Sequence, residues 1–111
     1  MPFLFVFIPL SFLERNEMIL KIPNRLIYHT DAGHGWLACK RQLIQDLGII
    51  DKLSSGSYQK GGTVYLEEDG DADTFFEALK LHGVAIEEIK SRITTSYREN
   101  SPVRCYARFS P

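Results

Sequence analysis

The sequence predicts an α+β domain with a small, mainly antiparallel sheet and two short helices on one face. The chain has 111 residues, of which 44% are hydrophobic and 24% charged, as in a single globular domain. Two segments carry apolar residues at helical spacing and end at a glycine, and several short runs alternate apolar with polar residues between turn signals. Helices and hairpins interspersed in this way are typical of the α+β class.

The first half of the domain is expected to hold two strands and a helix. Strands are predicted over 25–29 and 36–39, with the glycine-containing loop 30–35 between them. A helix is predicted over 40–47, and Gly48 follows it where a helix-ending glycine belongs. The apolar face of this helix consists of Leu43, Ile44 and Leu47.

The second half is expected to begin with a hairpin and a helix. The hairpin covers 57–66, and its turn is the KGG tripeptide, in which glycine tolerates the left-handed backbone of a tight turn. The helix covers about 72–82, between a cap at Asp71 or Asp73 and a terminal Gly83. The apolar face of this helix consists of Phe75, Phe76 and Leu79.

A final hairpin is predicted from two alternating runs, 89–98 and 103–109, around a turn at 99–102. The first run has a second interpretation, because Ile86, Ile89 and Ile93 also fit the spacing of a helix. With this hairpin in place, the two helices cover one face of the sheet, and the other face is solvated or used for binding.

The first thirteen residues, MPFLFVFIPLSFL, are almost wholly apolar. They are too few for a transmembrane helix, which needs about 20 apolar residues, and they lack the positive region of a secretory signal. Met18 offers a start that leaves residues 1–17 outside the native protein, and a strand or an interfacial anchor are the alternatives. The single α+β domain is therefore expected to span 18–111.

Charge is segregated along the chain although the formal net charge is only −1. Residues 1–60 carry +2 (7 bases, 5 acids), residues 61–89 carry −7 (1 base, 8 acids) and residues 90–111 carry +4 (5 bases, 1 acid). The balance excludes a strongly basic nucleic-acid coat and a strongly acidic DNA mimic. The cysteines, Cys39 and Cys105, are expected to be free, buried thiols of a cytoplasmic protein, with a single disulfide as the alternative.

Two runs, HTDAGHGWLACKR (29–41) and SYQKGGTVYLEEDGDA (57–72), resemble those of a group of small bacterial proteins, some of them encoded on mobile elements. The resemblance spans roughly 25–110 and leaves out the apolar N-terminus. It implies a cytoplasmic bacterial or phage-encoded protein and supports Met18 as the start. The group has no established activity, so the resemblance implies no catalytic residue.

Two loops are candidate contact surfaces for a protein partner, the glycine loop 31–36 and the acidic run 67–73. The candidate partner-binding residues are Asp31, His34, Trp36, Glu67, Glu68 and Asp69. Trp36 either anchors its loop on the core or stacks on a partner. The acidic run either caps the next helix or attracts a basic partner. Its D-x-D-x-D spacing is like the start of an EF-hand loop, but Thr74 and Lys80 stand where that loop needs Gly and Glu. A weak Ca²⁺ or Mg²⁺ site is an alternative.

A metal site is an alternative interpretation of the first loop. Imidazole and carboxylate groups of His29, Asp31 and His34 lie within six residues, and such groups bind zinc or another divalent metal. A module of this kind would be metal-binding or a metal-dependent hydrolase. The structural interpretation is that Asp31 shapes a turn by accepting bonds from backbone amides.

A nucleic-acid interface is the second alternative. The outer face of the predicted C-terminal hairpin carries Lys90, Arg92, Arg98, Arg104, Tyr106 and Arg108. Basic residues interleaved with an aromatic on a sheet can hold single-stranded nucleic acid, although an ordinary solvated sheet face has a similar composition.

Enzyme motifs are absent from the sequence: it has no nucleophile elbow, P-loop, dinucleotide fingerprint, HExxH or paired CxxC. The sequence therefore favours a small non-enzymatic binding or accessory protein without a required cofactor, and a protein is the expected partner.

Overall fold

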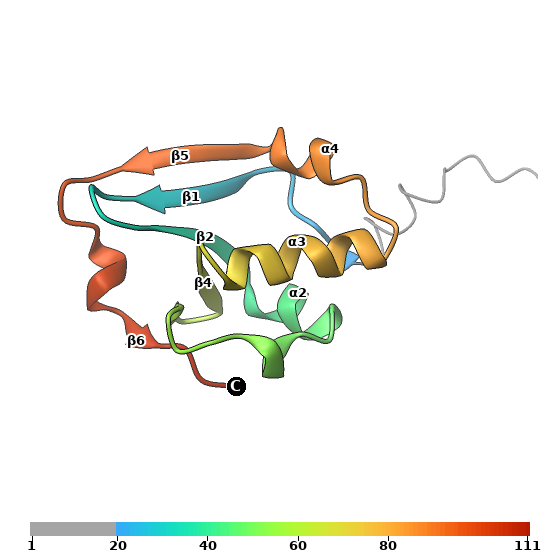
Figure 1. Cartoon of the computed structure of the whole chain (residues 1–111), viewed down its shortest axis with the longest axis horizontal. Helices are drawn as coiled ribbons and strands as arrows, with labels where there is room; N and C mark the ends of the chain where they lie inside the picture. The colour runs from blue at the N-terminus through green and yellow to red at the C-terminus, as the bar shows by residue number, and fades with distance from the viewer. Residues whose placement is uncertain (1–19) are drawn as a thin grey trace, which may run out of the picture.

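Six strands form one sheet in the order β5-β1-β2-β4-β3-β6 (Figure 1). This computed structural model describes residues 20–111, so the predictions for the N-terminal extension 1–17 lie outside the described residues. All strand pairs are antiparallel except β1 with β5, which is parallel. Helices pack against the sheet, so the predicted α+β class with a mainly antiparallel sheet is confirmed.

The strands alternate with short helices along the chain. The strands are β1 (Leu26–Thr30), β2 (Gly35–Lys40), β3 (Tyr58–Lys60), β4 (Thr63–Glu67), β5 (Ile93–Tyr97) and β6 (Ala107–Arg108). The α-helices are α2 (Arg41–Asp46), α3 (Asp71–Leu81) and α4 (Ile86–Lys90), and the 3-10 helices are η2 (Ile50–Lys52) and η3 (Pro102–Cys105). None of the helices within 20–111 has the length and hydrophobicity that crossing a bilayer requires.

Glycines mark the turns and helix ends where the sequence predicts them. Gly48 follows α2 with φ of 74°, and Gly83 follows α3 with φ of 80°. Gly61, in the turn between β3 and β4, has φ of 59°. Side chains other than glycine are strained in this left-handed region, so these residues define the element boundaries.

The main core lies between the sheet and α2, α3 and α4. Alternate residues of the central strands point into it, including Leu37 of β2 and both Val64 and Leu66 of β4. Phe75 and Leu79 of α3 and Ile89 of α4 cover them and are fully buried. The predicted apolar faces of the first helix, the hairpin and the second helix are therefore confirmed.

The C-terminal hairpin is a wrong prediction. Residues 86–90 form α4, as the helical alternative proposed, because Ile89 packs into the core. The strand that follows, β5, pairs with β1 at one edge of the sheet, whereas β6 pairs with β3 at the opposite edge. The segment 98–106 connects the two edges (Figure 1). The second predicted strand begins as η3, because Pro102 starts a 3-10 turn and Ser101 accepts a hydrogen bond from the amide of Val103. Within the predicted range, Ala107–Arg108 form a strand.

Two smaller predictions are also corrected. Gly70, not an aspartate, is the N-cap residue of α3, and no side chain caps this helix. The carboxylate of Asp71 instead accepts hydrogen bonds from the hydroxyls of Ser54 and Ser57, in the segment that leads into β3. Both cysteines are free thiols, but only Cys39 is buried, while Cys105 is exposed in η3.

Candidate functional site

The sheet face opposite the main core carries a cluster of ring side chains. Strand register places Trp36 beside His29 and places Tyr65 beside Tyr58, because paired residues of adjacent strands share a face. Tyr106, which follows η3, packs against the same cluster. We call this surface the ringed face and define it by His29, Trp36, Tyr58, Tyr65 and Tyr106.

The rings contact one another edge to face or at a tilt. The centroid of His29 lies 5.6 Å from that of Tyr65, and the Tyr65 centroid lies 5.0 Å from that of Tyr106. Trp36 lies 5.9 Å from Tyr58 in an edge arrangement. Trp36 and Tyr58 are buried beneath η3, whereas the other three rings are half-buried. The accessible part of the ringed face is therefore the row of His29, Tyr65 and Tyr106.

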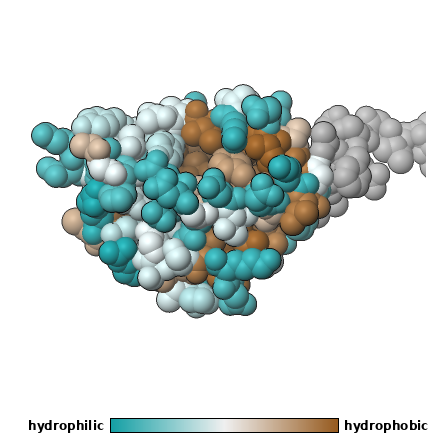
Figure 2. Space-filling model, viewed as in Figure 1, coloured by the Kyte–Doolittle hydropathy of each residue, from teal (hydrophilic) through white to brown (hydrophobic). Residues whose placement is uncertain are grey.

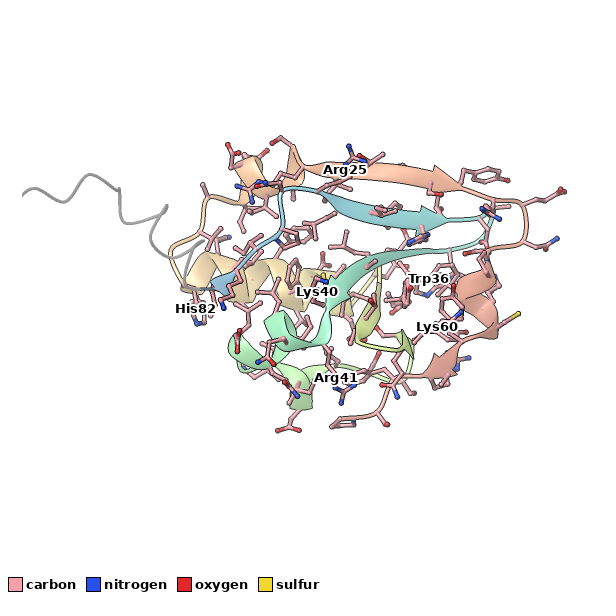
Figure 3. All side chains as sticks on the ribbon, turned by 180° about the vertical axis from the view of Figure 1, so that it is seen from behind. Arg25, Trp36, Lys40, Arg41, Lys60 and His82 are labelled. Atoms are coloured by element: carbon pink, nitrogen blue, oxygen red, sulfur yellow. The ribbon has the colours of Figure 1, made fainter. Side chains whose placement is uncertain are left out.

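Cationic side chains lie over three of the rings. Lys60 Nζ is 4.8 Å from the centroid of Tyr106, the guanidinium of Arg108 is 4.6 Å from that of Tyr58, and the guanidinium of Arg104 is 5.3 Å from that of Trp36. These are cation–π contacts, in which a positive charge lies directly against an aromatic ring. Two more bases, Arg25 and Lys40, border a hollow of about 200 Å³ on the same side of the sheet (Figure 3).

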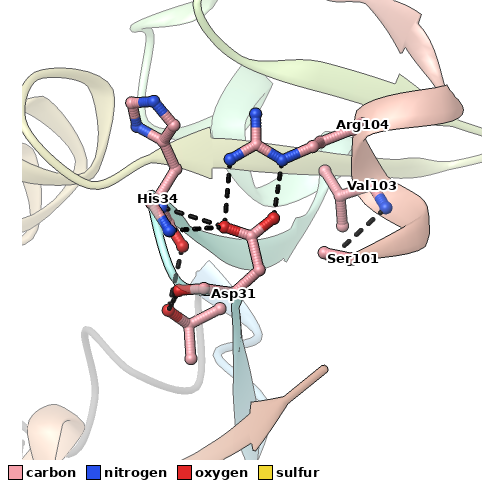
Figure 4. Close-up of polar contacts among 7 residues, drawn as sticks. Asp31, His34, Ser101, Val103 and Arg104 are labelled. Atoms are coloured by element: carbon pink, nitrogen blue, oxygen red, sulfur yellow. Dashed lines mark hydrogen bonds and ion pairs between the residues drawn. The ribbon is translucent and has the colours of Figure 1, made fainter. Parts of the chain in front are cut away.

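The loop between β1 and β2 is fixed by Asp31. Its Oδ1 accepts hydrogen bonds of 3.0 Å from the backbone amides of Gly33 and His34, as the structural interpretation predicts. Its carboxylate also receives Arg104, with Nε 2.6 Å from Oδ2 and Nη2 3.0 Å from Oδ1 (Figure 4). This bidentate pair, followed by the two backbone amides, holds the pKa of Asp31 well below its usual range.

A hollow of about 170 Å³ opens beside this ion pair. It is bordered by His34, Trp36, Gly56, Tyr58, Glu67, Arg104 and Arg108. Residues from the predicted protein contact and from the predicted nucleic-acid face thus meet at one place. The route differs from the predicted one, because η3 and β6, not a hairpin, bring the two arginines to the ringed face.

The remaining predicted nucleic-acid residues, Arg92 and Arg98, flank β5 at the opposite sheet edge, where the charge of Arg98 acts on His29. Arg92 donates to the carbonyl of Pro23 and forms an ion pair with Glu88, one turn earlier in the chain. Arg98 is exposed directly after β5, at the edge of the sheet remote from β6. The predicted basic surface is therefore divided between the two sheet edges.

The predicted acidic contact is divided in the same way. Glu67 borders the hollow beside Arg104, whereas Glu68 accepts a 2.7 Å hydrogen bond from the hydroxyl of Tyr28 on the helix side. Asp69 is exposed in the turn before α3. Asp31 and Trp36 are only 7% and 2% exposed, so their side chains support the fold at this loop and offer little contact area.

The three candidate metal ligands do not converge. His29 contacts Tyr65, and its pKa is lowered by burial and then by the charge of Arg98, while Asp31 is paired with Arg104. Within 20–111 no three His, Cys, Asp or Glu side chains gather in a geometry that would hold a metal ion.

Sequence reasoning missed Tyr58, Tyr65 and Lys60 as members of the site. Their signal is the alternation of the β3–β4 hairpin, where Val64 and Leu66 face the core and the residues between them face the other way. No pattern in the sequence predicts that β3 pairs with β6, and this pairing adds Arg108 to the ringed face.

The arrangement offers π-surfaces and positive charge on one side of the sheet. Among the described residues, Lys40, Lys60 and Arg108 form no ion pair with a carboxylate. Most exposed acids lie on the helices and their loops, including Asp69, Asp73, Glu77, Glu87 and Glu88. The charge segregation seen along the sequence thus becomes a difference between the two sides of the sheet.

No protein-family model, curated protein or solved structure matches this chain.

Proposed function

We propose that this protein is a non-enzymatic binding module that holds single-stranded nucleic acid on its ringed face. The observation that carries the proposal is the row of His29, Tyr65 and Tyr106, with Lys60 over the last ring. Bases of a single strand stack on exposed rings, and neighbouring cations neutralise the phosphates. A duplex fits this chemistry less well, because its bases are already stacked.

The net charge of −1 does not oppose this function, because the acids lie mainly on the other side of the sheet. Phosphate contacts depend on the local potential, which falls off over about 8–10 Å in physiological salt. Lys40, Lys60 and Arg108 contribute positive charge to the ringed face, where Glu67 is the neighbouring carboxylate.

A protein partner was the first expectation from the sequence, and the burial of Asp31 and Trp36 weakens its basis. An acidic protein remains the competing occupant of the ringed face, since it would also be attracted by the cations. The two occupants differ in their use of the rings, because carboxylates gain little from stacking.

The experiment is fluorescence anisotropy with labelled 12-nucleotide single strands of DNA and RNA, at several salt concentrations. The matched duplex and polyglutamate serve as competitors. We expect single strands to bind with an affinity that falls as salt rises, and to be displaced poorly by polyglutamate. Absence of binding at low salt, or equal competition by polyglutamate, would overturn the proposal.

Charge variants locate the surface. Lys40→Gln with Lys60→Gln removes two cations from the ringed face, and Lys52→Gln with Lys80→Gln removes two exposed cations elsewhere. The first pair should weaken binding and reduce the salt slope by about 0.7 for each lost phosphate contact. The second pair should leave the slope unchanged, and equal loss from both pairs would contradict a defined interface.

A further inference from the structure

A third hollow, of about 400 Å³, lies on the helix side of the sheet, on the face opposite the ringed face. Its walls are mostly apolar and come from Leu37, Ala72, Phe76 and Ile93. We call it the helix-side hollow. Apolar residues gather on the surface beside α4 in Figure 2, among hydrophilic neighbours. Its volume falls in the range of small-molecule sites, which is about 300–1,000 Å³.

A fixed carboxylate borders this hollow. The ring of Tyr28 lies across Gly35, where a Cβ would approach the Tyr28 hydroxyl to 1.8 Å. From this position the hydroxyl donates a 2.7 Å hydrogen bond to Glu68 Oε2, and the amide of Glu68 donates to the carbonyl of Gly35 at 3.0 Å. Glu68 is thus held by side chain and backbone, while its second carboxylate oxygen has no hydrogen-bond partner among the described residues.

An ammonium group borders the same hollow. Lys90, the last residue of α4, places its Nζ 5.4 Å from the ring centroid of Phe76 and forms no ion pair within the described part of the chain. Asp73, exposed in the first turn of α3, adds a second carboxylate. Charged groups of both signs therefore surround the apolar lining of the helix-side hollow.

We propose that the helix-side hollow binds a small zwitterion with an apolar body, of the class of a free apolar α-amino acid. The ammonium group of the ligand would bind Glu68 and Asp73, and the ligand carboxylate would bind Lys90. The ligand side chain would pack against the apolar lining of the hollow. Charge complementarity selects this class over a purely apolar ligand, which would desolvate the three charged groups without pairing them. The site lies on the other side of the sheet from the ringed face, so the proposal does not depend on nucleic-acid binding.

Isothermal titration calorimetry of the full chain tests the ligand class. The probes are L-phenylalanine and L-leucine, with phenethylamine and 3-phenylpropionate as analogues that each lack one charge. We expect an amino acid to bind at least about tenfold more tightly than either analogue, because each analogue leaves one charged partner unpaired. Equal binding of an analogue, or no heat from either amino acid at millimolar concentration, would overturn the proposal.

Two variants test the assigned contacts. Glu68→Gln keeps an acceptor for the Tyr28 hydroxyl but removes the charge, and Lys90→Gln removes the ammonium. Each should weaken amino-acid binding about tenfold or more, while Lys80→Gln, an exposed control on α3, should not. Thermal unfolding of each variant establishes that it is folded. Unchanged affinity in folded Glu68→Gln and Lys90→Gln proteins would refute the site.

Discussion

Asp31 Oδ2 lies 2.6 Å from Arg104 Nε, although 73 positions of sequence separate the two residues. The pair joins the loop between β1 and β2 to η3, and η3 is the element that covers Trp36. The second, smaller core of the molecule, formed by Trp36, Tyr58 and Val103, is therefore closed by an ion pair at its rim.

Removal of this ion pair should destabilise the fold in a pH-dependent way. The folded-state pKa of Asp31 is lowered, so the pair contributes stability above the unfolded value of about 3.9 and loses it as pH falls through the folded value. Asp31→Asn should therefore be less stable than the parent at pH 7, and the difference should shrink below about pH 4. Urea unfolding at a series of pH values measures this.

The matched control for this prediction is Asp51→Asn, at an exposed aspartate in η2. The free energy of unfolding of Asp51→Asn should equal that of the parent protein at every pH. A stability difference between parent and Asp31→Asn that stays constant down to pH 2 would show that the ion pair is not its source.

Gly35→Ala should destabilise the protein because the new methyl group overlaps the Tyr28 hydroxyl. Overpacking of this kind costs about 1–3 kcal/mol of unfolding free energy. Gly62→Ala is the control, since nothing lies within 4 Å of its added Cβ. Chemical denaturation of both variants measures the difference, and equal stabilities would show that Tyr28 moves aside freely.

The same substitution has a spectroscopic consequence. Burial, and then the hydrogen bond to Glu68, raise the pKa of Tyr28 to about 12. A displaced Tyr28 ring should titrate closer to the ordinary tyrosine value of about 10 in Gly35→Ala. Ultraviolet titration of tyrosinate, corrected with a Tyr28→Phe variant, reports this shift.

Ser57 links the acidic end of α3 to the sheet. Its hydroxyl donates to Asp71 Oδ2 and accepts a 2.9 Å hydrogen bond from the amide of Glu67. Because Ser57 is fully buried, Ser57→Ala leaves that amide without its partner, at a cost of about 1–3 kcal/mol. Urea unfolding should show this loss for Ser57→Ala but not for Ser55→Ala, whose side chain is exposed. Equal stabilities of the two variants would contradict the role of Ser57.

Local patterns predicted the elements whose structure is set by neighbouring residues. Gly48, Gly61 and Gly83 mark boundaries because their backbone conformations are local, and the buried alternation of β4 follows from a turn two residues long. The segment after α3 was not decided locally, since Ile89 and Ile93 fit both a helix and a strand. Ile89 is helical because it packs into the core, and Ile93 belongs to β5 because this strand pairs in parallel with β1.

The candidate site depends still more on distant pairings. The turn-forming bonds of Asp31 could be predicted, because its acceptor lies two and three residues from the amides. The ion pair of Asp31 with Arg104 could not be predicted, because it depends on the segment 98–106, which contains η3 and connects the two edges of the sheet. The ringed face likewise combines residues from four strands, β1 to β4, with Tyr106 after η3.

The two cysteines should differ sharply in reactivity. Cys39 is 2% exposed on the core side of β2, and burial raises the pKa of its thiol far above the ordinary value. Only thiolate reacts with a disulfide reagent, so one of the two thiols, Cys105, should react rapidly in the native protein at pH 8, and both should react in denaturant. Absorbance after addition of Ellman's reagent counts them.

Variants assign the two reaction phases. Cys105→Ser should abolish the fast phase and leave a slow one whose rate follows opening of the fold. Cys39→Ala should keep the fast phase and lose the slow one. Two fast thiols in the native protein would mean that the core around Cys39 opens readily. No fast thiol in the native protein would contradict the exposure of Cys105.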